Sequence, residues 1–279
     1  MKLRMLQSDR GVALLIVLLV TALLLALVFE FAYATRVSVR AAANFRDSQR
    51  AYFLARSGVN FVGKVLVDDL QQKRLQDNLE QKEWQVVPVI SAGDAELRVR
   101  WEDEAGKLNI AENLQVRNLF TVMQVDQRVA ERIAERVAER GKFFFLPELH
   151  EVMDDEEYNK VINYITTFTA QQTPVSINTA PLKVLQTRFI SAAAGADTDA
   201  ESIAEDCIRK RISKPFESSK DIADFLEYRN IVPSNVNAKE TSDYFRIHSH
   251  ATVGEYTRQV EAVIHRTATG FTVLSWRSL

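Results

Sequence analysis

Side chains able to bind a metal ion are few and scattered in this 279-residue chain. His248 and His250 stand two positions apart in an alternating stretch, so they share one face of a predicted strand and offer a metal two ligands. Spacing suggests no third ligand, and we interpret the pair as facing solvent. The single cysteine, Cys207, excludes an internal disulfide and a thiolate cage, and we interpret it as a small buried hydrophobe.

Two acidic clusters contain alternating or adjacent carboxylates, the groups that bind calcium in proteins. They are DDEE at 154–157 and DTDAE at 197–201. Neither has the glycine and spacing of an EF-hand, and the first also suits a helix start, where negative charge is favoured. Calcium stays an alternative at these clusters, but no specific residue supports it, so we assign no cofactor and no metal ligand.

Motifs of enzymes and of polyanion binders are missing from the sequence. It has no glycine-rich phosphate loop, no metalloprotease helix motif and no nucleophile elbow, and no nucleophile–base pair is readable. Lys and Arg number 35 against 37 Asp and Glu, for a formal charge of -2. We therefore expect a protein that is not an enzyme, and the charge balance gives no reason to expect nucleic acid.

A possible processing site opens the chain, in the stretch RGVALLI at 10–16. Residues 12–29 carry no charge, and Thr21 is their only polar member. As a helix they would be about 27 Å long, close to the hydrocarbon thickness of a bilayer. Glu30 marks the expected interface, with Phe31 and Tyr33 beside it as aromatic anchors.

Three interpretations of this segment compete. It could be a secretory signal cut at AYA (32–34), although its apolar region is longer than such signals use. It could be a plain membrane anchor, or a leader cut after Gly11 that leaves Val12 as the new amino terminus of a retained helix. Counted alone, basic residues would leave the bulk of the chain in the cytoplasm, because arginines after the span outnumber the basic residues before it. Those arginines are Arg36, Arg40, Arg46, Arg50 and Arg56.

A retained helix is favoured by the residues after the span. Phe45, Tyr52, Val59 and Leu66 recur every seven residues, which is an amphipathic stripe of helical period. No proline interrupts residues 12–87. We predict one long helix to about residue 70, half in lipid and half packed on a globular domain.

The strands are predicted in two separate parts of the sequence. The first part contains two predicted strands, at residues 84–90 and 95–101. In the strand at 95–101, Leu97, Val99 and Trp101 alternate with charged residues. The other part is an antiparallel meander over residues 245–276, with turns near residues 254 and 268. This order predicts an α+β domain whose sheet is divided in sequence.

Helical patterns fill the interval between the strands, from about 112 to 232, and contain a repeat. Phe143, Leu149 and Met153 have the same spacing as Phe216, Ile222 and Leu226, and each block follows a charged helix. We predict two related helix–turn–helix units, stacked on each other. In INTAPLKVL (177–185), Asn178 or Thr179 is the predicted helix cap, with Pro181 in the first turn.

Such paired helices also resemble helix–hairpin–helix modules, which bind nucleic-acid phosphates at glycine-containing hairpins. Only Gly141 and Gly195 fall in this interval, and its charge is mixed, with no basic stripe. A membrane-tethered nucleic-acid binder therefore stays the alternative function.

Taken together, five stretches resemble one known family, the minor pseudopilin K of type II secretion systems. They are RGVALLI (10–16), AYFLARSGV (51–59), DEAGKLNI (103–110), INTAPLKVL (177–185) and YFRIHSHATV (244–253). The resemblance lies in their order and covers essentially the whole chain.

The resemblance implies a pilin-like α+β fold, in which a long amino-terminal transmembrane helix packs on an antiparallel sheet. An inserted all-α domain of paired helix–turn–helix units interrupts the sheet. The implied parts are a prepilin-type leader (1–11), a transmembrane segment (12–34), a discontinuous pilin-like domain (35–111 and 236–279) and the helical insert (112–235).

The family also implies a location and a function. Cleavage by prepilin peptidase after Gly11 is expected, with methylation at Val12, and the bulk of the chain is expected in the periplasm on a single-pass inner-membrane anchor. With minor pseudopilins of the I and J types, and with inner-membrane assembly components, such a protein starts and caps a filament that promotes export of folded proteins. Most pilin-like subunits carry Glu five residues past the cut; Ile16 stands there instead, as is typical of the K type.

One departure from the family concerns metal binding. Longer members carry an acidic loop of the Trp-x-Asp-x-Asp kind after the first insert helix, and some bind calcium there. In this chain, Arg140-Gly141-Lys142 runs directly into Phe143, so that loop is missing. No metal ligands are carried over from the family.

Overall fold

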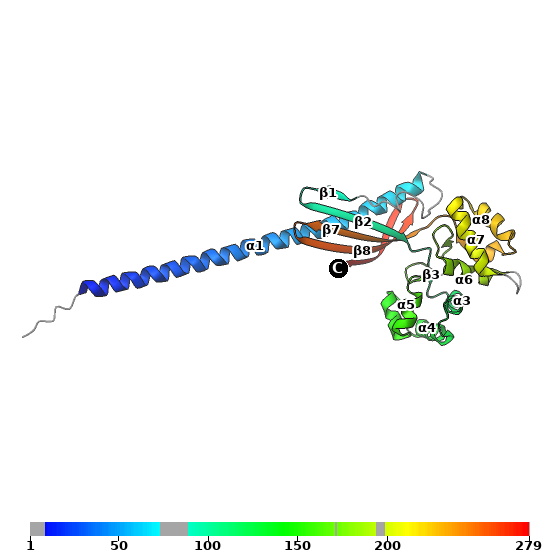
Figure 1. Ribbon diagram of the computed structural model, residues 1–279, viewed down its shortest axis with the longest axis horizontal. Coiled ribbons are helices and arrows are strands. Elements are labelled where there is room, and N and C mark those ends of the chain that lie inside the picture. The colour runs from blue at the N-terminus through cyan, green and yellow to red at the C-terminus, as the bar shows by residue number, and fades with distance from the viewer. Residues whose placement is uncertain (1–8, 73–88, 171, 194–198, 279) are drawn as a thin grey trace, which may run out of the picture.

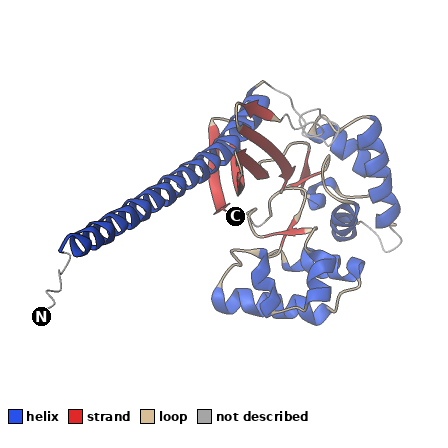
Figure 2. Ribbon diagram, turned by 60° about the vertical axis from the view of Figure 1, so that its left-hand side comes forward, coloured by secondary structure: helices blue, strands red, loops and turns tan. Residues whose placement is uncertain are grey.

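A computed structural model describes residues 9–72, 89–170, 172–193 and 199–278. One very long helix extends from a five-stranded sheet, and a helical part lies at the opposite end of the molecule (Figures 1 and 2). The start of α1 and the helical part are therefore at the two extremes of an elongated shape. This combination of helix and antiparallel sheet confirms the predicted α+β class.

The long helix α1 spans Asp9–Gln71, or 63 residues, which is about 95 Å. Its leucine- and alanine-rich first half favours helix, and no proline breaks it. Only its second half contacts the sheet, where the buried face begins at Ser48 and ends near Val67. Phe45, predicted as part of the packed stripe, is 68% exposed, because the buried face of α1 begins only at Ser48.

The sheet is antiparallel throughout and has the order β1-β2-β7-β8-β9. Its strands are β1 (Ile90–Ala92), β2 (Ala95–Asp103), β7 (Tyr244–Val253), β8 (Tyr256–Thr267) and β9 (Gly270–Ser278). The pairing of β2 with β7, for example Val99 opposite Ser249, joins the two parts predicted from sequence. Most of the strand predicted at 84–90 lies outside the described residues.

The core of this α+β part lies between α1 and one face of the sheet. Ala55, Val59, Val62 and Leu66 of α1 pack on alternate residues of the strands. The strand residues in this core are Leu97, Val99, Phe245, Ile247, Ala251, Val260, Ala262 and Ile264. Strict alternation in β7 leaves Arg246, His248, His250 and Thr252 on the other face, whereas Ser249 faces α1.

Two helical units of similar construction form the rest. The first contains β3 (Leu108–Asn109), α3 (Asn113–Met123), α4 (Gln127–Arg140), the 3-10 helix η1 (Leu146–Glu151), α5 (Asp155–Val161) and β4 (Ile165–Thr166). The second contains β5 (Val175–Ser176), α6 (Leu182–Ala192), α7 (Ala200–Ser213), α8 (Ser219–Glu227), α9 (Pro233–Val236) and β6 (Ala238–Lys239). In each unit the first strand pairs in parallel with the last.

The predicted repeat is present in this helical part. Helices α4 and α7 both have 14 residues, and both blocks of the repeat are buried in one shared core. The buried residues of the blocks are Phe143, Leu149, Met153, Phe216, Ile222 and Leu226. The strand pairs that close the two units were not predicted from the sequence. Each strand has two residues, which is too short for a periodic pattern.

Candidate assembly surfaces

The first half of α1 has no packing partner among the described residues. Its most apolar window has a mean hydropathy of 3.3 and is 0% buried. Large side chains there are well exposed, for example Leu19 at 69% and Phe29 at 73%. The hydroxyl of Thr21 donates to the carbonyls of Val17 and Leu18, so the one polar side chain of the span is satisfied within the helix. A continuous surface of this kind requires hydrocarbon or other apolar helices around it.

The predicted processing residues lie at the start of this surface. Because α1 begins at Asp9, Gly11 and Val12 are in its first turn. Ile16 follows Val12 by four residues, so the two lie on one face of the helix, 58% and 60% exposed respectively. A group at position 16 therefore stands one turn from an amino terminus created at Val12.

Several arginines that follow the span take part in contacts near the sheet. Arg50 forms an ion pair with Asp94 at 3.2 Å, in the turn between β1 and β2, and lies 3.6 Å from Asp47. Arg46 pairs with Asp47 at 2.9 Å. Part of the basic charge after the span is thus matched by carboxylates of the same chain.

The turn after β2 joins the sheet to both helical units. Asp103 is 7% exposed, and its carboxylate accepts hydrogen bonds from the amide of Ala105, at 2.7 Å, and from the hydroxyls of Thr179 and Ser242. Thr179 precedes α6, whereas Ser242 precedes β7. One buried carboxylate therefore holds the second unit against the sheet.

Glu104, the next residue, does the same for the first unit. It is fully buried, accepts a hydrogen bond from the Thr166 hydroxyl of β4 at 2.8 Å and pairs with Arg246 of β7 at 2.6 Å and with Lys107 at 3.0 Å. Burial alone would raise the pKa of Glu104, but Lys107 and Arg246 outweigh it and hold this pKa below its usual value. The carboxylate is therefore ionised and paired.

The prediction of Asn178 or Thr179 as the cap of α6 is wrong, because the junction uses both side chains for other contacts. The helix begins at Leu182 with Pro181 as its N-cap, not with Asn178 or Thr179. Asn178 instead exchanges hydrogen bonds with the backbone of Phe216, and Thr179 donates to Asp103. Both side chains are used for contacts between elements, which local sequence cannot reveal.

The two histidines with possible metal chemistry lie on the polar face of the sheet. His248 Nε2 is 3.4 Å from Glu102 Oε1, and this hydrogen bond is the main reason that the pKa of Glu102 falls to about 2. Burial and the neighbouring cation of Arg100 lower the pKa of His250. Among the described residues no three His, Cys, Asp or Glu side chains are grouped so that they could hold a metal ion.

The acidic clusters serve as helix starts where the structure describes them. Asp154 caps α5 in a reciprocal box with Glu157, and Asp199 accepts a hydrogen bond from the amide of Ser202 at the start of α7. Residues 197 and 198 lie outside the described residues. Calcium at these clusters stays an untested alternative.

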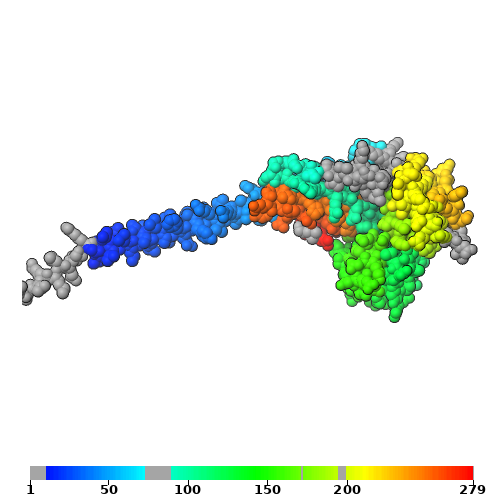
Figure 3. All heavy atoms as spheres, in the orientation of Figure 1, coloured from blue at the N-terminus to red at the C-terminus, as the bar shows by residue number. Residues whose placement is uncertain are grey.

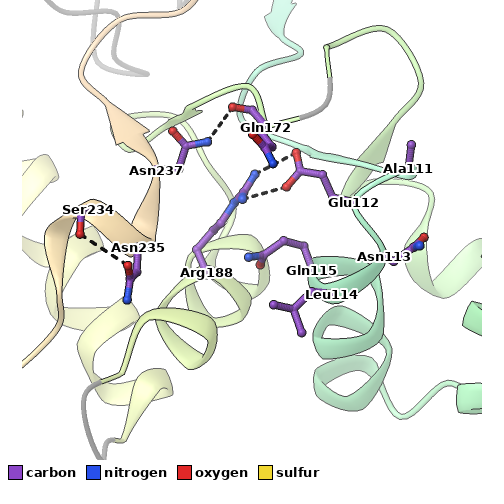
Figure 4. Close-up of a pocket in the computed structure, with 10 residues that line it drawn as sticks. All are labelled: Ala111, Glu112, Asn113, Leu114, Gln115, Gln172, Arg188, Ser234, Asn235 and Asn237. Carbon is purple, nitrogen blue, oxygen red and sulfur yellow. Dashed lines mark hydrogen bonds and ion pairs between the residues drawn. The ribbon is translucent and has the colours of Figure 1, made fainter.

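A cavity of about 610 Å³ lies between the two helical units (Figure 4). Arg188 of α6 and Glu112, next to α3, form a paired contact in it, with 2.9 Å between Nη1 and Oε2, and their side chains are 4% and 9% exposed. Asn237 donates to the carbonyl of Gln172 at 2.7 Å across the same cavity. The charge of Arg188 is neutralised within the cavity, so this side chain joins the units and leaves no free cation.

Comparisons with known proteins find a likeness among solved structures. No family model matches the chain, and a search of curated proteins finds no match. Among solved structures, a chain of the GspK–GspI–GspJ complex from the type 2 secretion system of enterotoxigenic Escherichia coli matches with a TM-score of 0.69. The match covers 85% of this chain and 99% of that chain, at 16% sequence identity. The fold is pseudopilin-like.

Two groups of residues stand out in this pseudopilin-like fold: the predicted site residues on α1 and the residues of the junction. Gly11, Val12 and Ile16 lie together at the start of α1, while cleavage and methylation stay predictions. Asp103 and Glu104 hold the fold together, whereas in the sequence they stand out only as part of the stretch DEAGKLNI (103–110). The available signal was a run of three acids, Glu102, Asp103 and Glu104, at the end of a half-buried strand whose alternation requires one of them to face the core.

Proposed function

We propose that this chain is a minor pseudopilin of the K type, which starts and caps the periplasmic filament of a type II secretion system. The observation that carries the proposal is the likeness to a chain of the GspK–GspI–GspJ complex over 85% of this chain. That complex brings together three proteins, so minor pseudopilins of the I and J types are the proposed partners. Prepilin peptidase and inner-membrane assembly components are proposed as further partners.

The shape of the molecule supports a position at the filament tip. The apolar half of α1 extends from one end, and the two helical units widen the other end (Figure 1). Helix α1 can pack among the helices of neighbouring subunits or in the inner membrane, while the bulky end has room only where no further subunit follows. The bulk of the chain would then lie in the periplasm.

Ile16 supports the same position by a charge argument. A carboxylate at this position would form an ion pair with the positively charged amino terminus of the next subunit. At the tip that partner is missing. An unpaired charge in an apolar environment is costly, whereas isoleucine carries no such penalty. Among the described residues that line the cavity between the units, the cation of Arg188 is paired with Glu112, which counts against a nucleic-acid phosphate as its ligand.

The deciding experiment is to map the mature amino terminus in cells with and without prepilin peptidase. We expect mass spectrometry to find Val12 as the first residue, carrying one methyl group, and to find Met1 when the peptidase is absent. An intact Met1 in the presence of the peptidase, or a start at Thr35, would contradict the proposal.

A further inference from the structure

Two of the arginines that follow the apolar span have no counter-charge in the described part of the chain. Arg46 and Arg50 lie 2.9 and 3.6 Å from the carboxylate of Asp47. Arg36 and Arg40 are exposed, and neither forms an ion pair with a described residue. In the space-filling view, the blue part of α1 stands clear of the sheet and of the helical units (Figure 3). The two positive charges can therefore meet a partner outside the chain.

Glu30, the acid that precedes them on α1, lies on another side of the helix. Six residues separate Glu30 from Arg36, so the two side chains are about 120° apart around the axis. Side chains three or four positions apart meet on a helix surface, and no Asp or Glu stands at that spacing from Arg36 or Arg40. The two arginines are themselves four positions apart, and their mutual repulsion is relieved when they share an anion.

An aromatic surface continues from the arginines toward the start of the helix. Phe29, Tyr33, Arg36 and Arg40 follow one another at intervals of four, three and four residues, so they lie within about 60° of one another around α1. Phe29 and Tyr33 are both well exposed. These four residues, the arginine stripe, change in order from apolar, to aromatic with a hydroxyl, to cationic. A phospholipid has the same order from its acyl chains, through its glycerol esters, to its phosphate.

The position of the arginine stripe along α1 matches the interface of a bilayer. Phe29 is the last residue of the uncharged span, and Arg36 follows it by about 10 Å along the axis. Helical side chains lean toward the amino terminus, so the guanidinium of Arg36 reaches back toward a head-group layer about 5–7 Å thick. Arg40 lies one turn further out, and Tyr33 lies at the depth where tyrosine is enriched. The two guanidinium groups can thus meet a head-group phosphate from both sides.

The charge of the arginine stripe selects a lipid with a net negative charge. Guanidinium groups bind phosphate oxygens through paired hydrogen bonds. A zwitterionic head group brings its own cation, which the two arginines repel, whereas the head group of phosphatidylglycerol brings none. Lipid phosphates surround the helix at this depth, while the carboxylates of a partner protein would have to come within one or two turns of the bilayer. An anionic phospholipid is therefore the occupant that fits.

We infer that the arginine stripe is a binding site for an anionic phospholipid. The site requires the membrane anchor proposed above, on whichever side of the membrane the sheet lies. The probe is an equal mixture of phosphatidylglycerol and phosphatidylcholine with identical acyl chains, added to the full chain in neutral detergent. Native mass spectrometry measures the ratio of the two lipids bound to the chain.

One pair of variants separates the two arginines from the overall charge of the chain. Arg36→Gln combined with Arg40→Gln removes both cations of the stripe. Arg56→Gln combined with Arg98→Gln removes the same charge from two exposed arginines elsewhere and is the matched control.

A rotated variant separates the stripe from charge near the membrane in general. It combines Arg36→Val, Val37→Arg, Arg40→Ala and Ala41→Arg, so its composition and charge are unchanged. Both cations move by about 100° around α1 and leave the face of the aromatic residues. Val37 and Ala41 are exposed and precede Ser48, where the buried face begins, so the globular part keeps its packing.

We expect the unchanged chain to bind at least about five times more phosphatidylglycerol than phosphatidylcholine, because each arginine near a membrane surface favours anionic lipid several-fold. The ratio should fall to within about two-fold of one when Arg36 and Arg40 are both replaced by Gln, and also in the rotated variant. It should stay near the unchanged value in the matched control.

Three results would overturn the inference. They are equal binding of both lipids by the unchanged chain, an undiminished ratio in the rotated variant, and the same loss in the matched control. If both lipids bind equally while Arg36→Gln with Arg40→Gln weakens the complex with pseudopilins of the I and J types, the arginines serve a protein partner instead. Sedimentation with phosphatidylcholine vesicles reports the anchor by itself. A chain that sediments but has no lipid preference contradicts the lipid site and leaves the proposed function to its own experiment.

Discussion

At position 16, an isoleucine stands one helical turn from Val12 in a segment whose side chains contact no described part of the chain. In apolar surroundings, the free energy of placing a side chain in hydrocarbon determines which residues are tolerated at this position. A charged residue costs about 2.5–3.5 kcal/mol at the centre of a membrane helix. A carboxylate is tolerated only where a positive partner is available.

Replacing this residue tests the tip position. Ile16→Glu should impair filament initiation or allow incorporation below the tip, and we expect secretion to fall by at least about ten-fold, because an unpaired charge in an apolar environment is costly. Ile16→Leu is the matched control and should secrete normally. Filament number and export are measured in cells that lack the natural copy. Normal export with unchanged filament number in Ile16→Glu would count against the tip.

Glu104 and Arg246 form the other decisive contact at the residue scale. The carboxylate is fully buried and the guanidinium is 13% exposed, and they meet where the first helical unit joins the sheet. Removing Arg246 leaves Lys107 as the remaining cationic partner of the buried Glu104, and a buried charge with incomplete pairing is more costly than a pair that was never present.

Arg246→Ala should therefore lower the free energy of unfolding by about 3–5 kcal/mol. Arg98→Ala, at a 67%-exposed arginine of the same sheet, should cost less than about 1 kcal/mol. Urea unfolding of the full chain in detergent measures both. Adding Glu104→Gln to Arg246→Ala should recover part of the loss, since it removes the buried charge. Equal losses for the two arginines would show that burial of the pair is unimportant.

At the scale of elements, the contact between α1 and the sheet is unusually close at Gly58. A Cβ built on this residue would be 2.4 Å from Ser249 Oγ and 2.8 Å from Val99 Cγ2. Real Cβ contacts are essentially never this short, so the helix could not keep its distance from the sheet with any larger residue. Glycine is needed at Gly58 for the approach of two elements, even though it weakens the helix locally.

We therefore expect Gly58→Ala to destabilise the protein by about 1–3 kcal/mol through overpacking. Helix propensity alone predicts the opposite, a gain of about 1 kcal/mol. Ser57→Ala, on the exposed side of the same turn, is the control and should have little effect. Thermal unfolding of both variants in detergent decides between the two effects. A stabilised Gly58→Ala would mean that α1 does not pack this closely on β2 and β7.

At the scale of the whole molecule, the apolar and the packed halves of α1 have separate roles. Contacts with the sheet begin at Ser48, and both hydrophobic cores consist of residues after that point. The first half adds no packing to the globular part. The proposed membrane attachment and the folding stability thus depend on different stretches of one continuous helix.

Truncation separates these two properties. A chain that starts at Ala41 should unfold within about 3 °C of the full chain, because it keeps both cores, and should no longer sediment with lipid vesicles. A chain that starts at Arg56 loses Ser48, Ala51 and Ala55 from the buried face and should unfold at a clearly lower temperature. If the chain that starts at Ala41 already unfolds, the apolar half of α1 must contribute to folding stability. That result would contradict the separation of the two halves.

The α+β class, the long helix and the paired helical units could be predicted because each depends on a local pattern. Periodicity of apolar residues follows from the geometry of a helix or a strand, and blocks such as Phe143 to Met153 and Phe216 to Leu226 repeat that pattern. The absence of charge in residues 12–29 likewise determined, without any structure, that this stretch needs an apolar environment.

Only the tertiary structure decided which residues meet across long separations. Asp103 with Thr179, Glu104 with Thr166 and Arg246, and Gly58 with Ser249 join positions that lie far apart in the chain, so spacing carries no trace of them. The start of the buried stripe at Ser48 depends on how far the sheet reaches along α1. The place of β9 at the edge of the sheet depends on which strand comes last, since order and register arise from packing between distant segments.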